Sequence, residues 1–224
     1  MPERPVKQPT VDAPGEDGYF DEEVAARFDD DYDYQAEADV VGPMVDFIAS
    51  LAGDGGALEL GSGTGRIAIP LAKRGVPVHG IELSKAMTAR LRAKPGGKDI
   101  AVTIGDFATA TANGSFRVAY LVANTIMNLT SQAAQVACFR NVAAHLEPGG
   151  YFVIEVGVPR LQRLPPGETF QVFDASDEHW GIDEYDTVDQ GLISASFPAA
   201  RRRPVGAHFS PFPLRLAGGA RPDG

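Results

Sequence analysis

The sequence is poor in residues that could cross-link the chain or bind a metal ion. Its one cysteine, Cys138, excludes an internal disulfide framework and suits a reducing, cytoplasmic compartment. Because Cys138 lies on a helical pattern with Val136 and Phe139, we expect a buried structural thiol. No Cys/His spacing is typical of a zinc site, so no bound metal is expected.

Long apolar runs and an excess of basic charge are missing as well. No apolar stretch approaches the ~18 residues of a membrane-spanning helix, and the polar, proline-rich start is unlike a signal peptide. The formal net charge of −10 argues against binding to a nucleic-acid backbone, which requires a basic face. We therefore expect neither a membrane nor a nucleic acid as partner.

The acidic residues are concentrated near the N-terminus. Residues 16–39 contain eleven acidic side chains and one basic one, Arg27. A solvated acidic helix is one interpretation of this charge. The other is a lid that favours a cationic cofactor or a substrate amine.

What the sequence does contain is a glycine-rich turn. Residues 57–66 read Ala-Leu-Glu-Leu-Gly-Ser-Gly-Thr-Gly-Arg, so an apolar run leads into Gly61, Gly63 and Gly65. Glycines at this spacing allow a tight strand-to-helix turn and a close approach of ligand to backbone. Glu82 ends the next apolar run, where a carboxylate can accept both hydroxyls of a ribose. The pattern predicts a nucleoside-binding crevice.

Short apolar segments alternate with helical ones through the middle of the chain. Strands are expected at 57–60, 76–82, 100–104, 117–123 and 150–156, and helices at 66–74, 84–93 and 131–146. The strands are rich in Val and Ile, which is typical of strands covered by helices on both faces. The alternation predicts an α/β fold with a Rossmann-like, doubly wound, mostly parallel sheet.

Four segments are expected along the chain. Residues 1–18 form a disordered lead, and residues 19–158 form the Rossmann-like core with N-terminal lid helices. Residues 159–194 form a small antiparallel cover that contributes to substrate binding, with strands at Phe170–Phe173 and Tyr185–Ile193. Residues 195–224 form an irregular tail.

The glycine spacing separates two classes of nucleoside cofactor. The dinucleotide fingerprint has its third glycine three residues after the second, and this chain has Arg66 at that position. Asp106 follows the third expected strand, where a carboxylate can accept a hydrogen bond from the adenine amine. The spacing and this second acid favour a cofactor other than a dinucleotide.

With these motifs the chain resembles the class I S-adenosylmethionine-dependent methyltransferases of the small-molecule type. The resemblance rests on Leu58–Arg66, Gly80–Ser84 with Met87, Gly105–Phe107, Val118–Asn124 and His145–Gly150. It implies S-adenosylmethionine as cofactor and a small molecule as methyl acceptor. It also implies methyl transfer to a nitrogen or oxygen atom by in-line displacement.

The resemblance also assigns roles to single residues. The glycine turn would pass under the methionine part of the cofactor, Glu82 would hold the ribose and Asp106 the adenine edge. Leu83, Met87 and Phe107 would sandwich the adenine ring or belong to the ordinary core. The implied cofactor-binding set is Glu59, Gly61, Ser62, Gly63, Thr64, Gly65, Arg66, Glu82, Leu83, Met87, Asp106, Phe107 and Asn124.

The sequence marks no residue as a catalytic base, so the catalytic residues are unknown at this stage. The sequence does not give the oligomeric state either. Asn124 follows the fourth strand, where the family places groups that face cofactor and substrate, but it could equally cap the next segment. His79 lies in an expected strand and His145 in an expected helix. Both are expected to be structural or exposed.

Two alternatives stay open. One is an NAD(P)-dependent oxidoreductase, and the other is a non-catalytic remnant that binds the cofactor but lacks its C-terminal strands. The second arises because residues 195–224 contain five prolines, four glycines and a triple arginine without a regular period. Pro213–Asp223 can be encoded by codons that, when read one nucleotide later, encode a segment resembling the ending of a methyltransferase. We hypothesise a one-nucleotide shift near residue 195.

Overall fold

The computed structural model describes residues 19–31, 38–159, 161–177, 179–188, 190–198 and 206–211. The chain divides into two compact units. The first comprises the residues up to Thr125 together with Val136–Glu155, and the second comprises Ile126–Gln135 and the residues from Val156 onward. The expected lead at 1–18 and much of the expected irregular tail lie outside the described residues.

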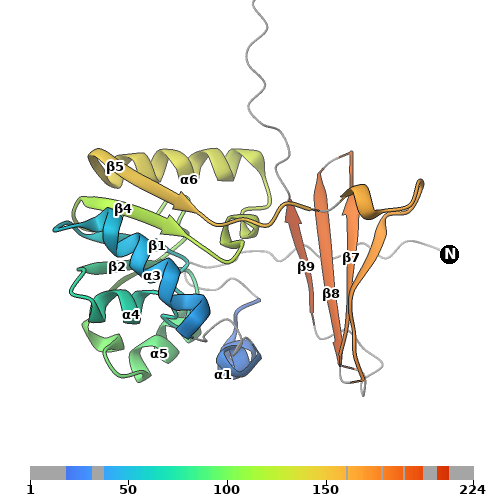
Figure 1. Cartoon of the computed structure of the whole chain (residues 1–224), viewed down its shortest axis with the longest axis horizontal. Helices are drawn as coiled ribbons and strands as arrows, with labels where there is room; N and C mark the ends of the chain where they lie inside the picture. The colour runs from blue at the N-terminus through green and yellow to red at the C-terminus, as the bar shows by residue number, and fades with distance from the viewer. Residues whose placement is uncertain are drawn as a thin grey trace, which may run out of the picture. The chain divides into compact units, whose positions relative to one another are not determined.

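The first unit is built around a parallel sheet of five strands (Figure 1). The strands are β1 (Ala57–Leu60), β2 (Val78–Glu82), β3 (Ala101–Ile104), β4 (Phe116–Leu121) and β5 (Leu146–Ile154), in the order β3-β2-β1-β4-β5. The order reverses between β1 and β4, and open α/β sheets bind ligands beside the carboxyl ends of the strands at such a point. The predicted parallel α/β fold is confirmed.

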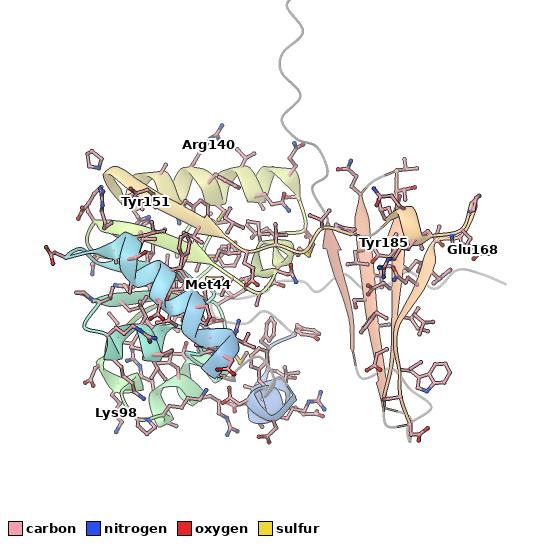
Figure 2. All side chains as sticks on the ribbon, viewed as in Figure 1. Met44, Lys98, Arg140, Tyr151, Glu168 and Tyr185 are labelled. Atoms are coloured by element: carbon pink, nitrogen blue, oxygen red, sulfur yellow. The ribbon has the colours of Figure 1, made fainter. Side chains whose placement is uncertain are left out.

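Helices cover both faces of this sheet. They are α1 (Glu22–Asp31), α3 (Ala38–Ala52), α4 (Ala68–Lys73), α5 (Lys85–Ala93) and α6 (Gln132–His145). On one face the fully buried Val45 and Ile48 of α3 pack with Val118 of β4, and Met44, labelled in Figure 2, joins this cluster. Side chains alternate between the faces of a strand, and Ala119, the residue after Val118 in β4, is fully buried too. The core therefore lies on both sides of the sheet.

Strand β5 begins earlier than the sequence predicts. It starts at Leu146, directly after α6, whereas residue 150 was the expected start. Leu146 pairs with Phe116, but the register then shifts, and the regular ladder resumes only at Tyr151. Pro148 cannot donate a ladder hydrogen bond, and Gly149 has φ 76°. The Pro-Gly-Gly segment therefore forms an irregularity inside the strand and does not separate helix from strand.

The second unit contains an antiparallel sheet of four strands. These are β6 (Phe170–Ala175), β7 (His179–Asp186), β8 (Gly191–Pro198) and β9 (Gly206–Pro211), in that order. The expected antiparallel cover is present, but the expected strand Tyr185–Ile193 spans the turn between β7 and β8. In that turn the Val188 N–H donates to Asp186 Oδ1 at 2.9 Å, and Gln190 has φ 57°. Strands β8 and β9 extend into the segment 195–224.

Candidate functional site

The glycine turn connects β1 to α4 and has the predicted backbone conformation. Gly61, Gly63 and Gly65 have φ values of 72°, 52° and 85°, a region that L side chains rarely adopt. A Cβ on Gly61 would lie 2.6 Å from Thr125 Cγ2, and one on Gly65 would lie 3.0 Å from Ile69 Cδ1. Gly63 differs, because no heavy atom lies within 4 Å of its Cβ position. The centre of the turn therefore leaves room for a ligand.

Glu82 links this turn to the start of α5. Its Oε2 accepts a hydrogen bond from the Gly63 N–H at 2.6 Å, and its Oε1 accepts one from the Ser84 N–H at 2.9 Å. The side chain is held at the end of β2 and is only 7% exposed. A carboxylate at the end of a strand, beside a glycine turn, is a group that can accept hydrogen bonds from the hydroxyls of a ribose.

Three buried polar atoms near the turn make no hydrogen bond of good geometry among the described residues. They are Glu59 Oε2, Ser62 Oγ and the Tyr120 hydroxyl. Glu59 of β1 pairs with Tyr120 of β4 on one side and with Gly80 of β2 on the other. Ser62 Oγ lies close to Gly80, because a Cβ added to that glycine would be 2.6 Å from it. Buried polar atoms without partners are costly. They fit a site that receives polar groups from a bound ligand or water.

Burial raises the pKa of Glu59 from 4.5 to about 8. Its neighbours Tyr120 and Arg66 oppose this rise, and the charge of Glu82 adds to it. Burial, followed by the charge of Glu59, raises the pKa of Tyr120 well above its ordinary value. Glu59 is therefore largely a neutral carboxylic acid at neutral pH in this structure. Arg66 itself is half-buried beside the turn.

The residues that the resemblance places around an adenine are gathered next to Glu82 and at the end of β3. Met87 and Phe107 are 3% and 7% exposed, and Leu83 is half-buried. Asp106 is exposed, and its Oδ1 accepts a hydrogen bond from the Ala108 N–H at 2.8 Å. Serine is a preferred N-cap residue, and Ser84 caps α5, because its Oγ accepts from the Met87 N–H at 3.1 Å. That cap fixes the first turn of α5, which carries Met87.

Two side chains of α6 hold the loop that follows Asp106, and the sequence did not point to them for this role. The Asn141 side-chain amide donates to the carbonyls of Phe107 and Ala110, at 2.9 and 2.8 Å. His145 Nε2 accepts from the Ala112 N–H at 3.0 Å, and Nδ1 donates to the Asn141 carbonyl at 2.7 Å. His145 is buried and structural, as predicted. An amide on a helix has no sequence signal for such a long-range contact.

Replacing Asn141 by Ala should loosen this loop. The change leaves two carbonyls without their donor, so we expect a loss of about 1–3 kcal/mol in the free energy of unfolding. Urea denaturation measures the loss. The matched control is Arg140→Ala, since Arg140 is the exposed neighbour of Asn141 on the same helix (labelled in Figure 2). Equal midpoints for the two variants would show that Asn141 does not hold the loop.

The other histidine and the cysteine are also structural. His79 Nε2 lies 2.8 Å from Thr103 Oγ1 on the neighbouring strand. Burial, with a contribution from His145, lowers the pKa of His79. Cys138 is fully buried, which confirms the prediction, and burial followed by the charge of Asp106 raises its pKa to about 12. The Cys138 thiol is therefore protonated at neutral pH and is not an activated nucleophile.

The backbone is strained where β4 ends. Ala123 and Asn124 have φ values of 55° and 60°, which are uncommon for residues other than glycine. Glu155 holds the pair, since its carboxylate accepts from the Ala123 N–H at 2.9 Å and its carbonyl from the Asn124 N–H at 3.3 Å. Strained residues cluster at functional sites. Of the two alternatives for Asn124, a strained backbone favours a group that faces the site over a residue that only caps the next segment.

Helix α1 reaches the same site. Thr64 Oγ1, in the glycine turn, donates to Asp29 Oδ1 of α1 at 2.6 Å. Ser84 Oγ donates to the Phe20 carbonyl, just before α1, at 2.5 Å. The acidic N-terminal helix is thus held against the glycine turn and the start of α5, and it is not only a solvated surface. Asp29 was missed as a site residue, because one acid among eleven in the acidic stretch carries no distinguishing signal.

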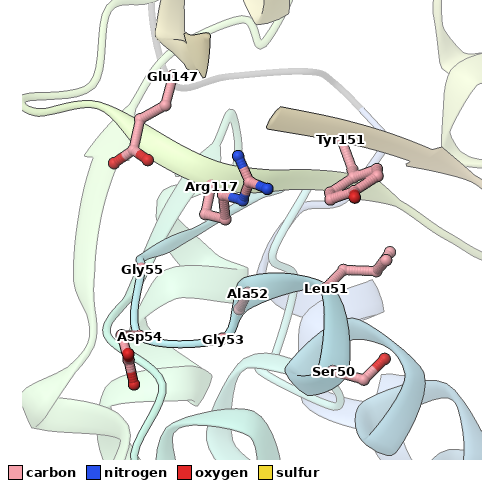
Figure 3. Close-up of a pocket in the computed structure, with 9 residues that line it drawn as sticks. All are labelled: Ser50, Leu51, Ala52, Gly53, Asp54, Gly55, Arg117, Glu147 and Tyr151. Carbon is pink, nitrogen blue, oxygen red and sulfur yellow. The ribbon is translucent and has the colours of Figure 1, made fainter. Parts of the chain in front are cut away.

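A pocket of about 430 Å³ lies at the other end of the sheet (Figure 3). It is lined by Ser50–Gly55, Arg117, Glu147 and Tyr151, and the Arg117 guanidinium lies 5.3 Å from the centre of the Tyr151 ring. These residues come from the C-terminal end of α3, from the turn before β1, from the start of β4 and from β5. Because open α/β sheets bind ligands at the carboxyl ends of their strands, we assign this pocket no role in catalysis.

Within the described part of the chain, no group of three or more His, Cys, Asp or Glu is arranged to hold a metal ion. No described helix is long and apolar enough to cross a membrane.

Comparison with known proteins identifies the class to which this site belongs. A family model described as a methyltransferase domain matches residues 57–150, from β1 into β5. The CcbJ methyltransferase from Streptomyces caelestis is 32% identical, with a TM-score of 0.61 over 75% of this chain and 69% of that chain. CalS10, an amino pentose methyltransferase from Micromonospora echinaspora, is 21% identical, with a TM-score of 0.62 over 84% and 83% of the two chains. That second likeness shows the fold.

A further relative matches a shorter part of the chain. The cypemycin N-terminal methyltransferase of a Streptomyces species is 33% identical over 93 residues, which are 42% of this chain and 38% of that protein. The match therefore spans well under half of that relative's length.

The chain belongs to the class I S-adenosylmethionine-dependent methyltransferases. S-adenosylmethionine is the cofactor of that class, and the comparisons give no support to the oxidoreductase alternative. The residues present fit this group. Gly63 leaves open space, the Glu82 carboxylate lies directly behind it, and the buried Ser62 Oγ in the turn makes no hydrogen bond among the described residues.

Proposed function

We propose that the chain transfers a methyl group from S-adenosylmethionine to a nitrogen or oxygen atom of a small molecule by in-line displacement. The observation that carries the proposal is the placement of Glu82, whose carboxylate lies at the end of β2 and ties the Gly63 N–H to the start of α5. The glycine turn would lie along the methionine part, and Asp106 would accept from the adenine amine. Leu83, Met87 and Phe107 would enclose the ring.

The cofactor, when bound, supplies an electrophilic methyl group on a positively charged sulfur. The chain then has to align the acceptor with that methyl group and exclude water from the line of attack. An amine acceptor must lose its proton before it reacts, and a hydroxyl needs a base within hydrogen-bond reach. His145 cannot be that base, because both of its ring nitrogens are held by backbone groups.

The name of the cypemycin relative, an N-terminal methyltransferase, supports an amine as acceptor. The test is an assay with labelled S-adenosylmethionine against paired amines and alcohols of the same carbon skeleton. Transfer to amines, rising with pH as the amine loses its proton, is the expected result. Transfer to alcohols alone would contradict the nitrogen assignment, and transfer to neither class would contradict the small-molecule assignment.

The alternative is a remnant that binds the cofactor without catalysis, and one feature favours it. Among the described strands β5 pairs only with β4, and the side chains of Phe139 and Tyr151 beside this edge are 51% and 45% exposed. We infer that a segment other than residues 195–224 covers this edge in the functional protein. Sequencing the gene beyond codon 195 tests the inference, and it fails if the alternate frame encodes no methyltransferase-like ending.

A further inference from the structure

One face of α1 contacts both ends of the proposed cofactor site. Ala25 packs in a buried cluster with Ala86 and Met87 of α5, and Phe20 and Phe28 cover this cluster. Asp29 accepts the hydrogen bond from Thr64 in the glycine turn. Residues three and four apart share one face of a helix. Helix α1 therefore contacts both the adenine side and the methionine side of the proposed site, through Ala25, Phe28 and Asp29.

The contacts of Asp29 tie the helix to two elements. Oδ1 accepts from Thr64 Oγ1 at 2.6 Å, and Oδ2 pairs with Lys94 Nζ at 2.7 Å at the C-terminal end of α5. Thr64 is 2% exposed, so its hydroxyl has little access to water as a substitute partner. The side chains of Lys94 and Asp29 are 32% and 48% exposed, so the ion pair is partly screened by solvent.

We propose that Asp29 is a positioning residue that holds α1 closed over the cofactor and sets how long the cofactor stays bound. We call its contacts with Thr64 and Lys94 the clasp. The proposal rests on the proposed function of the glycine turn. Helix α1 contacts the glycine turn at Thr64 and the adenine side at Met87, and opening the helix requires the buried Thr64 hydroxyl to lose its acceptor.

The second end of α1 is held independently of the clasp. Ser84 Oγ donates to the Phe20 carbonyl, and the Ser84 N–H donates to Glu82. The helix is thus anchored next to the proposed ribose contact even when Asp29 is changed. We therefore expect loss of the clasp to free the C-terminal end of α1, near Asp29, more than its N-terminal end, near Phe20.

The test compares Asp29→Ala and Asp29→Asn with a matched control, Asp30→Ala, at an exposed position on the same helix. Hydrogen exchange of residues 19–31 in the cofactor-free protein reports on the helix, and stopped-flow release of S-adenosylmethionine reports on the site. Charge-assisted hydrogen bonds predict that Asp29→Ala raises exchange near Asp29 and the release rate by about 10–100-fold. The control should change neither rate appreciably.

Asp29→Asn separates the two contacts. It keeps an acceptor for Thr64 but loses the charge that faces Lys94, so we expect an intermediate release rate. Release from the unchanged protein should speed up with salt, because the ion pair is screened, whereas Asp29→Asn should show a smaller salt effect. A merely structural role for Asp29 would lower thermal stability without this salt difference.

Distinct results overturn distinct claims. Unchanged hydrogen exchange in Asp29→Ala would show that Asp29 does not hold the helix. Faster exchange with unchanged cofactor release would show that the helix does not gate the site. No binding of S-adenosylmethionine by the unchanged protein would overturn the proposed function itself, and hydrogen exchange would still decide whether Asp29 holds α1.

Discussion

Replacing Glu82 by Ala should nearly abolish cofactor binding. The carboxylate is the proposed acceptor for both ribose hydroxyls, and each such charged hydrogen bond contributes about 1.5–3 kcal/mol. The dissociation constant for S-adenosylmethionine should therefore rise by a factor on the order of 10²–10⁴. Isothermal calorimetry measures this rise directly.

The structure adds a second consequence of the same substitution. Glu82 also accepts from the N–H groups of Gly63 and Ser84, so its removal frees the glycine turn from the start of α5. Asp46→Ala is the control, since Asp46 lies on α3, carries an equal charge, and forms an exposed ion pair with Arg74 at the end of α4. Affinity in Glu82→Ala equal to that of the control, with the fold retained by circular dichroism, would refute the ribose assignment.

Replacing Glu59 by Gln should change how stability depends on pH. The folded state raises the pKa of Glu59 to about 8, whereas in the unfolded chain the value is near 4.5. Between these values the folded state holds a proton that the unfolded state has released, so stability falls as pH rises. The contribution is fully present below about pH 4.5 and is lost by about pH 8.

Gln keeps the size of Glu but does not titrate. Glu59→Gln should therefore match the unchanged protein near pH 5 and exceed its stability near pH 8.5 by a few kcal/mol, because each unit of pKa shift corresponds to about 1.4 kcal/mol. Urea unfolding at several pH values between 5 and 9 measures the two curves. Parallel curves over this range would mean that Glu59 titrates normally in the folded protein.

Much of the first unit could be predicted from the sequence because its signals are local. Glycine spacing fixed the turn at Gly61–Gly65, and apolar runs marked the strands. The N-cap at Ser84 needed only the chemistry of one hydroxyl next to a helix start. The position of Glu82 beside the turn could be predicted for a similar reason, since the end of a strand predicts which side chains meet at the edge of the sheet.

The contacts that were missed depend on residues far apart in the chain. Asp29 and Thr64 are separated by 35 positions, and Asn141 and Phe107 by 34. No local pattern distinguishes Asp29 from its acidic neighbours, or Asn141 from any other polar residue of a helix. The turn between β7 and β8 was missed because its flanking residues are apolar enough to continue a strand pattern. Its left-handed Gln190 has no sequence signal as strong as a glycine.

Calorimetric titration of the full chain with S-adenosylmethionine, S-adenosylhomocysteine and NAD tests the central claim most directly. The claim is that the turn at Gly61–Gly65, with Glu82 behind it, is a binding site for the sulfur cofactor. We predict saturable binding at one site for both sulfur compounds, loss of that binding in Glu82→Ala, and no binding of NAD. Saturable binding of NAD without binding of either sulfur compound would contradict the claim.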